Sequence, residues 1–356
     1  MHAIAVILGL ALVAITVADA FQTVVVARHA HALPALTRLV YRLTWTPFAA
    51  CARLIRSERR RDKYLGIYGP LSLLLLLGIW AVGMIVAFGV LQWSMPLQRD
   101  GASSRLAYDI YFSAATFFTL GAGEPQNVAS RYLMVLEAGF GFSFLGLVIG
   151  YLPVLYQSFS TRELRILLLD ARAGSPPSAA QFILRLRDDA ATLQERLADW
   201  EEWALDQLQS HLSYPMLAYY RSQHTNQCWL AALTTIVDVS ALAMLAGEGS
   251  IKRQAELTFA AGRHALVHTA SIFRAETQRH RHDRLPSAEF SRLRGVIAAN
   301  PTPLRSDRIA EPELKKLRAT YEPYAAALAA YFVMALPPWI LSARAIDNWQ
   351  VDSWVP

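Results

Sequence analysis

Thr119, Gly121 and Gly123 stand at alternate positions of a short loop, a spacing that suits the binding of a cation by backbone carbonyl oxygens. A dehydrated cation needs oxygen ligands in place of its water, and successive carbonyls supply them only if all point toward one axis. That arrangement needs unusual backbone angles at alternate residues, which glycine adopts at positive φ without steric cost. Thr119 adds a hydroxyl oxygen. The candidate filter residues are Thr119, Leu120, Gly121, Ala122 and Gly123, and Glu124 follows them.

The loop follows a short apolar and aromatic stretch that begins at Asp109, within the sequence DIYFSAATFFTLGAGEPQN of residues 109–127. This stretch is about ten residues long, which is too short to cross a bilayer core. We expect a short helix whose negative C-terminal dipole end faces a waiting cation. Non-helical backbone is tolerated at membrane depth only where protein shields it or where it lines a watery cavity. The segment therefore predicts a re-entrant pore loop, with pore helix and filter over 109–125.

Two long apolar stretches flank the loop and a third precedes them, and each is long enough to span a membrane. They are residues 1–27, 68–93 and 132–157. A cleaved signal peptide is the other interpretation of the first stretch, but only His2 stands where such a peptide usually has a basic region. The predicted fold class is an all-α membrane protein with three transmembrane helices, a re-entrant pore loop and a helical cytoplasmic C-terminal domain over 158–356.

Charge separates the chain into two parts, although the whole has 17% charged residues and a net charge of +6. Residues 1–157 hold 12 Lys or Arg and 7 Asp or Glu, whereas residues 158–356 hold 22 and 21. Residues 28–67 alone contain nine basic and two acidic residues, a net +7. Their arginines alternate with apolar residues at helical spacing, which is typical of an amphipathic segment on anionic lipid.

The positive-inside rule puts the basic segment 28–67 in the cytoplasm. The N-terminus and residues 94–131 then face outside, and residues 158–356 are cytoplasmic. The expected location is a bacterial-type inner membrane. A nucleic-acid-binding arm is the other interpretation of an arginine cluster, but a position between two spans favours lipid, so no nucleic-acid partner is expected.

Residues 68–157 resemble the pore of the two-transmembrane potassium-channel family, the bacterial ion-channel domain, with its outer helix, pore helix, filter and inner helix. The family filter reads Thr-Val-Gly-Tyr-Gly-Asp, and this chain has Thr-Leu-Gly-Ala-Gly-Glu over 119–124. The Thr and both glycines match, and Glu124 keeps an acid at the outer mouth. Ala122 departs from the pattern, because the family's aromatic ring at this place braces the filter. Phe117 or Phe118 would take over that bracing.

The resemblance implies a homotetrameric channel that conducts K⁺, or another monovalent cation, passively through a filter of carbonyl groups. It implies no enzyme activity, no cofactor and no metal beyond the permeant ion. Ala122 leaves the choice between K⁺ and non-selective conduction open. The alternative is a membrane-anchored signalling or scaffold protein that keeps a degenerate pore fold. A subunit of a potassium uptake transporter is disfavoured, because such proteins usually have four pore motifs per chain and this chain has one.

The third apolar stretch contains residues that could bend it. Gly146 and Gly150 are hinge candidates, and Pro153 could kink the cytoplasmic end. Small residues also simply pack helices together in membranes, and the sequence does not separate the two roles. Glu137 lies near the outer third of this stretch, and an acid inside a membrane predicts a functional residue.

The C-terminal part is predicted to be helical throughout. Residues 178–211 place apolar side chains at helical spacing opposite an acidic face, after a break at 175–177. Two further runs, 229–246 and 325–341, are apolar enough to resemble spans, but they contain Asp238 and a Pro-Pro pair. Because charge and paired proline are costly in lipid, both runs are expected to be buried helices of a soluble bundle.

No motif for catalysis or metal binding stands out in the sequence. His264 and His268 lie four residues apart and could supply two corners of a zinc site, but no further ligand completes the pattern. The histidines within 280–282 are expected to be solvated. Cys51 and Cys228 do not suggest a disulfide framework, and Cys228 is expected to be a core thiol.

Overall fold

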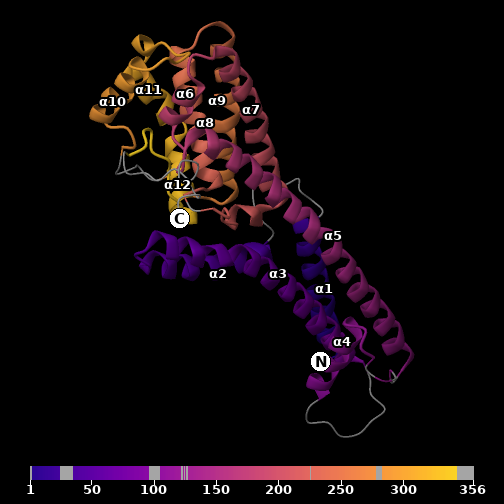
Figure 1. The fold of residues 1–356 in the computed structure, drawn as a ribbon. Coiled ribbons are helices and arrows are strands. Elements are labelled where there is room, and N and C mark those ends of the chain that lie inside the picture. The colour runs from indigo at the N-terminus through magenta and orange to yellow at the C-terminus, as the bar shows by residue number, and fades with distance from the viewer. Residues whose placement is uncertain are drawn as a thin grey trace, which may run out of the picture. The chain divides into compact units, whose positions relative to one another are not determined.

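The computed structural model describes residues 2–24, 35–95, 105–121, 123, 125, 127–224, 226–277 and 283–342 of the 356-residue chain. Within these residues the protein consists of helices, turns and loops, without a β-strand (Figure 1), so the predicted all-α class is confirmed. The chain divides into two compact units. The first holds α1, the first half of α2, α3 from Pro70 onward, α4, and α5 as far as Gln157; the second holds the remainder.

Four helices are long and apolar enough to cross a membrane, namely α1 (His2–Val24), α3 (Glu58–Ser94), α5 (Val128–Ala173) and α8 (Trp229–Ala246). The second and third of these helices contain the predicted stretches 68–93 and 132–157, and α1 covers residues 2–24 of the predicted stretch 1–27. α3 and α5 extend beyond the predicted 68–93 and 132–157, and Pro70 and Pro153 lie inside them without ending either helix. α5 ends where Gly174 takes a positive φ of 85° ahead of Ser175-Pro176, which is a usual way for a helix to stop.

The two apolar runs of the C-terminal part lie inside the second unit. In α8, 89% of the residues are buried by protein, so the expectation of a buried helix over 229–246 is confirmed. The run 325–341 contains most of α12 (Glu322–Phe332), which ends where Val333 adopts the left-handed conformation. Residues 334–342, which include the Pro-Pro pair, are not helical. The second run is therefore not one long helix, as the sequence suggested, but a short helix followed by an irregular segment.

Small residues bring the helices of the first unit close together. A Cβ atom at Gly9 of α1 would lie 2.6 Å from Leu91, and one at Gly89 of α3 would lie 2.9 Å from Ile110 of α4 (Arg105–Phe117). Such close approach is typical of helix contacts in membranes, where packing rather than apolar burial holds helices together. The core of the unit consists of Ala81, Met84, Ile85, Phe88, Leu91 and Phe117.

A buried acid in α1 caps another helix. Asp19 is 5% exposed and accepts hydrogen bonds from the backbone N–H groups of Leu36 and Thr37, the Thr37 hydroxyl and the Trp80 indole, at 2.6 to 3.2 Å. Leu36 and Thr37 belong to the first turn of α2 (Ala35–Leu54), whose N–H groups have no partner within the helix. Asp19 thus accepts hydrogen bonds from the N–H groups at the start of α2, and each of its two carboxyl oxygens accepts two hydrogen bonds.

The second unit is a helical bundle in which α9 (Gly249–Ile272) packs on both α7 (Ala190–Ser213) and α8 (Figure 1). Shorter elements complete it: α6 (Ala179–Leu186), η1 (Pro215–Tyr219), α10 (Ser287–Ala298), η2 (Ser306–Arg308), α11 (Glu311–Ala319) and α12. The amphipathic stretch 178–211 is helical as predicted, but it forms two helices, because the chain breaks between α6 and α7. Asp189 caps α7 by accepting hydrogen bonds from the N–H and hydroxyl of Thr192, and this cap favours a new helix start.

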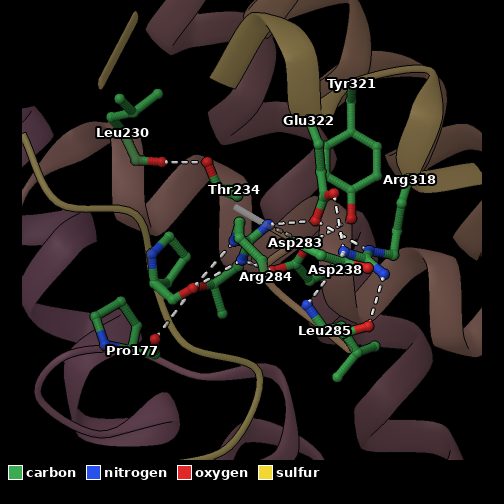
Figure 2. Close-up of polar contacts among 12 residues, drawn as sticks. Pro177, Leu230, Thr234, Asp238, Asp283, Arg284, Leu285, Arg318, Tyr321 and Glu322 are labelled. Carbon is green, nitrogen blue, oxygen red and sulfur yellow. Dashed lines mark hydrogen bonds and ion pairs between the residues drawn. The ribbon is translucent and has the colours of Figure 1, made fainter. Parts of the chain in front are cut away.

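A buried ionic network explains the acid in the middle of α8. Asp238 is fully buried and accepts hydrogen bonds from Arg284 at 2.6 Å and from the Tyr321 hydroxyl, as Figure 2 shows. Arg284 also pairs with Glu322 at 3.0 Å, and Arg318 bonds the same carboxylate. Since every charge is matched, the cost of burying Asp238 is offset.

Candidate functional site

The candidate filter begins where α4 ends in a Schellman turn. The N–H of Leu120 bonds the carbonyl of Ala115 at 2.8 Å, and the N–H of Thr119 bonds that of Thr116 at 3.0 Å. This turn needs a left-handed residue, usually glycine, and here Thr119 fills the place with φ 56°. A β-branched residue at positive φ is strained, and strain of this kind gathers at functional sites.

Positive φ recurs at every second residue of the loop. Thr119 has φ 56°, Gly121 has φ 81° and Gly123 has φ 89°, whereas Leu120 between the first two is not left-handed. A Cβ atom at Gly121 or Gly123 would meet no other atom within 4 Å. Backbone conformation rather than lack of room therefore explains glycine at both positions. Ala122 and Glu124 lie outside the described residues.

The side chains behind the loop are buried in the first unit. Ser113, Thr116 and Phe117 of α4 are 0 to 3% exposed, and Phe117 packs on the ring of Phe144 from α5. Phe118 is 55% exposed, so Phe117 is the aromatic residue that is fixed in the core beneath the loop. Thr119, Leu120, Gly121 and Gly123 are exposed in the single chain.

Glu137 of α5 lies in the same buried layer and joins three helices. It is fully buried and is hydrogen-bonded to Ser113 of α4, while the Ser113 hydroxyl donates at 2.7 Å to the carbonyl of Ile85 in α3. The sequence pointed to Glu137 but not to a partner. A small polar residue at Ser113, among the apolar and aromatic residues of 110–115, is the signal that could have identified it.

The glycines of α5 fall into two groups. A Cβ atom at Gly141 would overlap the carbonyl oxygen of Phe117, so glycine is required where α5 crosses the end of α4. At Gly139, Gly146 and Gly150 a Cβ atom would meet no atom within 4 Å. Gly146, Gly150 and Pro153 lie within one uninterrupted helix. Gly141 is a positioning residue, in line with the close packing that small residues permit in membrane helices, and the hinge role of Gly146, Gly150 and Pro153 stays a prediction.

The basic segment 28–67 forms α2 and the first turns of α3 where the structure describes it. In α2, Val40, Tyr41 and Trp45 are buried, whereas Leu39 and Leu43 are 51% and 64% exposed. Arginines such as Arg42 lie on the exposed side with these leucines. The amphipathic helix predicted from the spacing is confirmed over 35–54, and an exposed mixture of Arg and Leu suits a lipid surface.

No metal site forms among the described residues, in which no group of three or more potential His, Cys, Asp or Glu ligands comes together. The His264 and His268 rings stack on each other, 5.1 Å apart. Cys228 is buried at the start of α8, as expected for a core thiol, and burial raises its pKa. The histidines within 280–282 lie outside the described residues.

Comparison with known proteins gives no match for this chain, whether with family models, curated proteins or solved structures. The resemblance of residues 68–157 to potassium-channel pores therefore rests on the motif itself. The geometry of the loop is independent of that resemblance and is the basis of the proposal below.

Proposed function

We propose that this chain is the subunit of a cation channel, K⁺-like in its chemistry, with Thr119 to Gly123 as the filter. The observation behind the proposal is the alternation of positive φ at Thr119, Gly121 and Gly123, directly after a short helix between two apolar helices. Residues of alternating handedness direct successive carbonyl groups to the same side of the chain, as a dehydrated cation requires. The C-terminal dipole end of α4 favours positive charge next to the loop.

A closed ring of loops requires an oligomer, and the resemblance to potassium-channel pores implies a homotetramer. One chain supplies one loop, so several copies must surround an axis before carbonyls can replace the water of an ion on all sides. In the 18-residue apolar segment of α5, only 11% of the residues are buried in the single chain, whereas 56% are buried in the corresponding segment of α3. We propose that α5 is the inner helix and that neighbouring subunits cover part of this face.

In this proposal α1, α3 and α5 cross a bacterial-type inner membrane and the helical second unit is cytoplasmic. The basic segment 28–67 fixes this orientation by the positive-inside rule, and α2 contacts anionic lipid through its exposed arginines and leucines. Glu124 then stands at the outer mouth, where an acid raises the local concentration of cations. Gly146, Gly150 and Pro153 are proposed hinge positions.

Potassium flux through purified protein in liposomes tests the function. We expect the wild type to take up K⁺ down a K⁺ gradient and Gly121→Asp to show at least a tenfold lower flux. A side chain at residue 121 disfavours the φ of 81°, and a carboxylate there would bind the cation in its path. Gly295→Asp, at an exposed position of α10 with no atom within 4 Å, is the control and keeps wild-type flux. Equally low flux in wild type and Gly121→Asp contradicts the proposal.

A further inference from the structure

A cavity of about 590 Å³ lies in the second unit. None of the residues that line it belongs to the candidate filter. Its walls are the first turns of α3, Pro176, residues 221–224 and 226–228, the start of α8 and the segment 335–337. A volume of this size is within the range of sites for small molecules. Neither the filter proposal nor the predicted lipid contact of α2 makes use of it.

The lining is rich in cations. Arg59, Arg61, Lys63 and Arg221 all contribute to it, together with two acids. Arg61 lies 3.7 Å from Glu58, and Arg221 lies 3.8 Å from Asp62, so these two charges are matched. Arg59 and Lys63 form no ion pair with any residue that the structure describes. The cavity thus keeps a formal excess of two positive charges, which favours an anion.

Two hydrogen-bond donors in the same lining lack an acceptor. The Nε atom of Arg61 and the Nε2 atom of Gln227 are buried, and neither has a partner among the described residues. A buried donor without an acceptor costs free energy, and both of these donors belong to residues of the cavity lining. The start of α8 adds to this, because Cys228 and Ala231 line the cavity and the N-terminal end of a helix favours negative charge.

We propose that this cavity binds a phosphorylated small molecule, with the phosphoryl group between the basic residues of α3 and the start of α8. A phosphoryl group combines negative charge with several acceptor oxygens, which matches the basic lining and its formal excess of two positive charges. The group could belong to a soluble molecule or to a phospholipid headgroup, and the two sources share this chemistry. The proposal does not depend on ion conduction.

Binding to the full-length protein in lipid nanodiscs tests the proposal with two probes. In the first arm, pyrophosphate is titrated into discs of pure phosphatidylcholine at constant ionic strength, and binding is measured by calorimetry. In the second arm, no soluble phosphate is present, and the thermal stability of the protein is compared between pure phosphatidylcholine discs and discs that contain phosphatidylglycerol. A saturable response in the first arm identifies a soluble ligand, and a response in the second alone identifies a lipid headgroup.

Two charge-matched double variants locate the site. Arg59→Gln with Lys63→Gln removes two lining cations, and Lys252→Gln with Arg253→Gln removes two exposed cations of α9 that neither line the cavity nor belong to the basic segment 28–67. We expect the lining pair to weaken the response about tenfold, through the loss of two charged contacts, and the control pair to leave it unchanged. No saturable response in either arm, or an equal loss in both double variants, overturns the proposal. Because both readouts measure binding, an inactive channel would leave them unaffected.

Discussion

Gly141 and Gly139 stand two residues apart in α5 and meet different surroundings. A Cβ atom at Gly141 would overlap the carbonyl oxygen of Phe117, the last residue of α4, whereas one at Gly139 would meet nothing within 4 Å. The position of the candidate filter thus depends on the absence of a single methyl group in α5. Sequence alone treats the two glycines as equivalent, since both are small residues in an apolar run.

Gly141→Ala is expected to destabilise the first unit by about 1 to 3 kcal/mol, the usual cost of overpacking a close contact. Gly139→Ala is expected to be neutral or slightly stabilising, because alanine is the better helix former and has room there. The measurement is the fraction of monodisperse detergent-solubilised protein that remains after heating. Equal heat sensitivity of the two variants would show that α4 and α5 do not meet as described.

Much of the helical layout follows from the sequence, because long apolar runs can satisfy their backbone only as helices. α1, α3 and α5 were predictable for this reason, and the glycine spacing predicted positive φ at Gly121 and Gly123. Contacts between distant segments were not predictable. The pairing of Glu137 with Ser113 and the capping of α2 by Asp19 join residues that no local pattern relates. The break before Asp189 was missed because its capping signal lies within a continuous amphipathic pattern.

Asp238 favours the protein interior over a membrane as the environment of α8. The helix is apolar enough for a membrane, yet its central carboxylate is buried against Arg284 and Tyr321. Asp238→Asn is expected to lower the stability of the second unit by about 3 kcal/mol, because Arg284 loses its closest counter-charge in a buried position. Denaturation followed by tryptophan fluorescence measures this, since the unit buries Trp200, Trp203, Trp229 and Trp339.

The control for that substitution is Asp307→Asn, which removes the exposed ion pair with Arg305. Its effect should stay below about 1 kcal/mol, as for other surface pairs. An Asp238 variant that unfolds at the same denaturant concentration as the Asp307 variant would mean that the network around α8 does not stabilise the unit.

His211 of α7 gives the second unit a pH dependence. It is fully buried beside Trp229, and burial, together with the nearby Arg162, lowers its pKa well below the ordinary value of 6.5. The unfolded chain therefore takes up a proton below about pH 6.5 that the folded chain does not. Stability is fully present above that pH and should fall by about 1.4 kcal/mol per pH unit as the pH drops below it.

The measurement is denaturation of the wild type and of His211→Gln between pH 7.5 and 5.5. The variant should show a flatter dependence over this range, whereas His264→Gln, at an exposed position, should keep the wild-type slope. A wild-type slope that persists in His211→Gln would assign the pH dependence to other groups.

At the scale of the whole molecule, the chain consists of two units. The first has three apolar helices and the short helix α4, and the second has a charged cavity. The apolar face of α5 is largely uncovered in the single chain, and in the proposed channel several copies assemble to cover it and to close a ring of loops. The central claim is that the loop from Thr119 to Gly123 conducts cations.

Recording of the purified protein in a planar lipid bilayer with symmetric K⁺ tests that claim most directly. The account predicts stepwise unitary currents from the wild type and from Gly295→Asp, and none from Gly121→Asp at equal protein incorporation. Stepwise currents that persist unchanged in Gly121→Asp, or a wild-type protein that gives none, would contradict it.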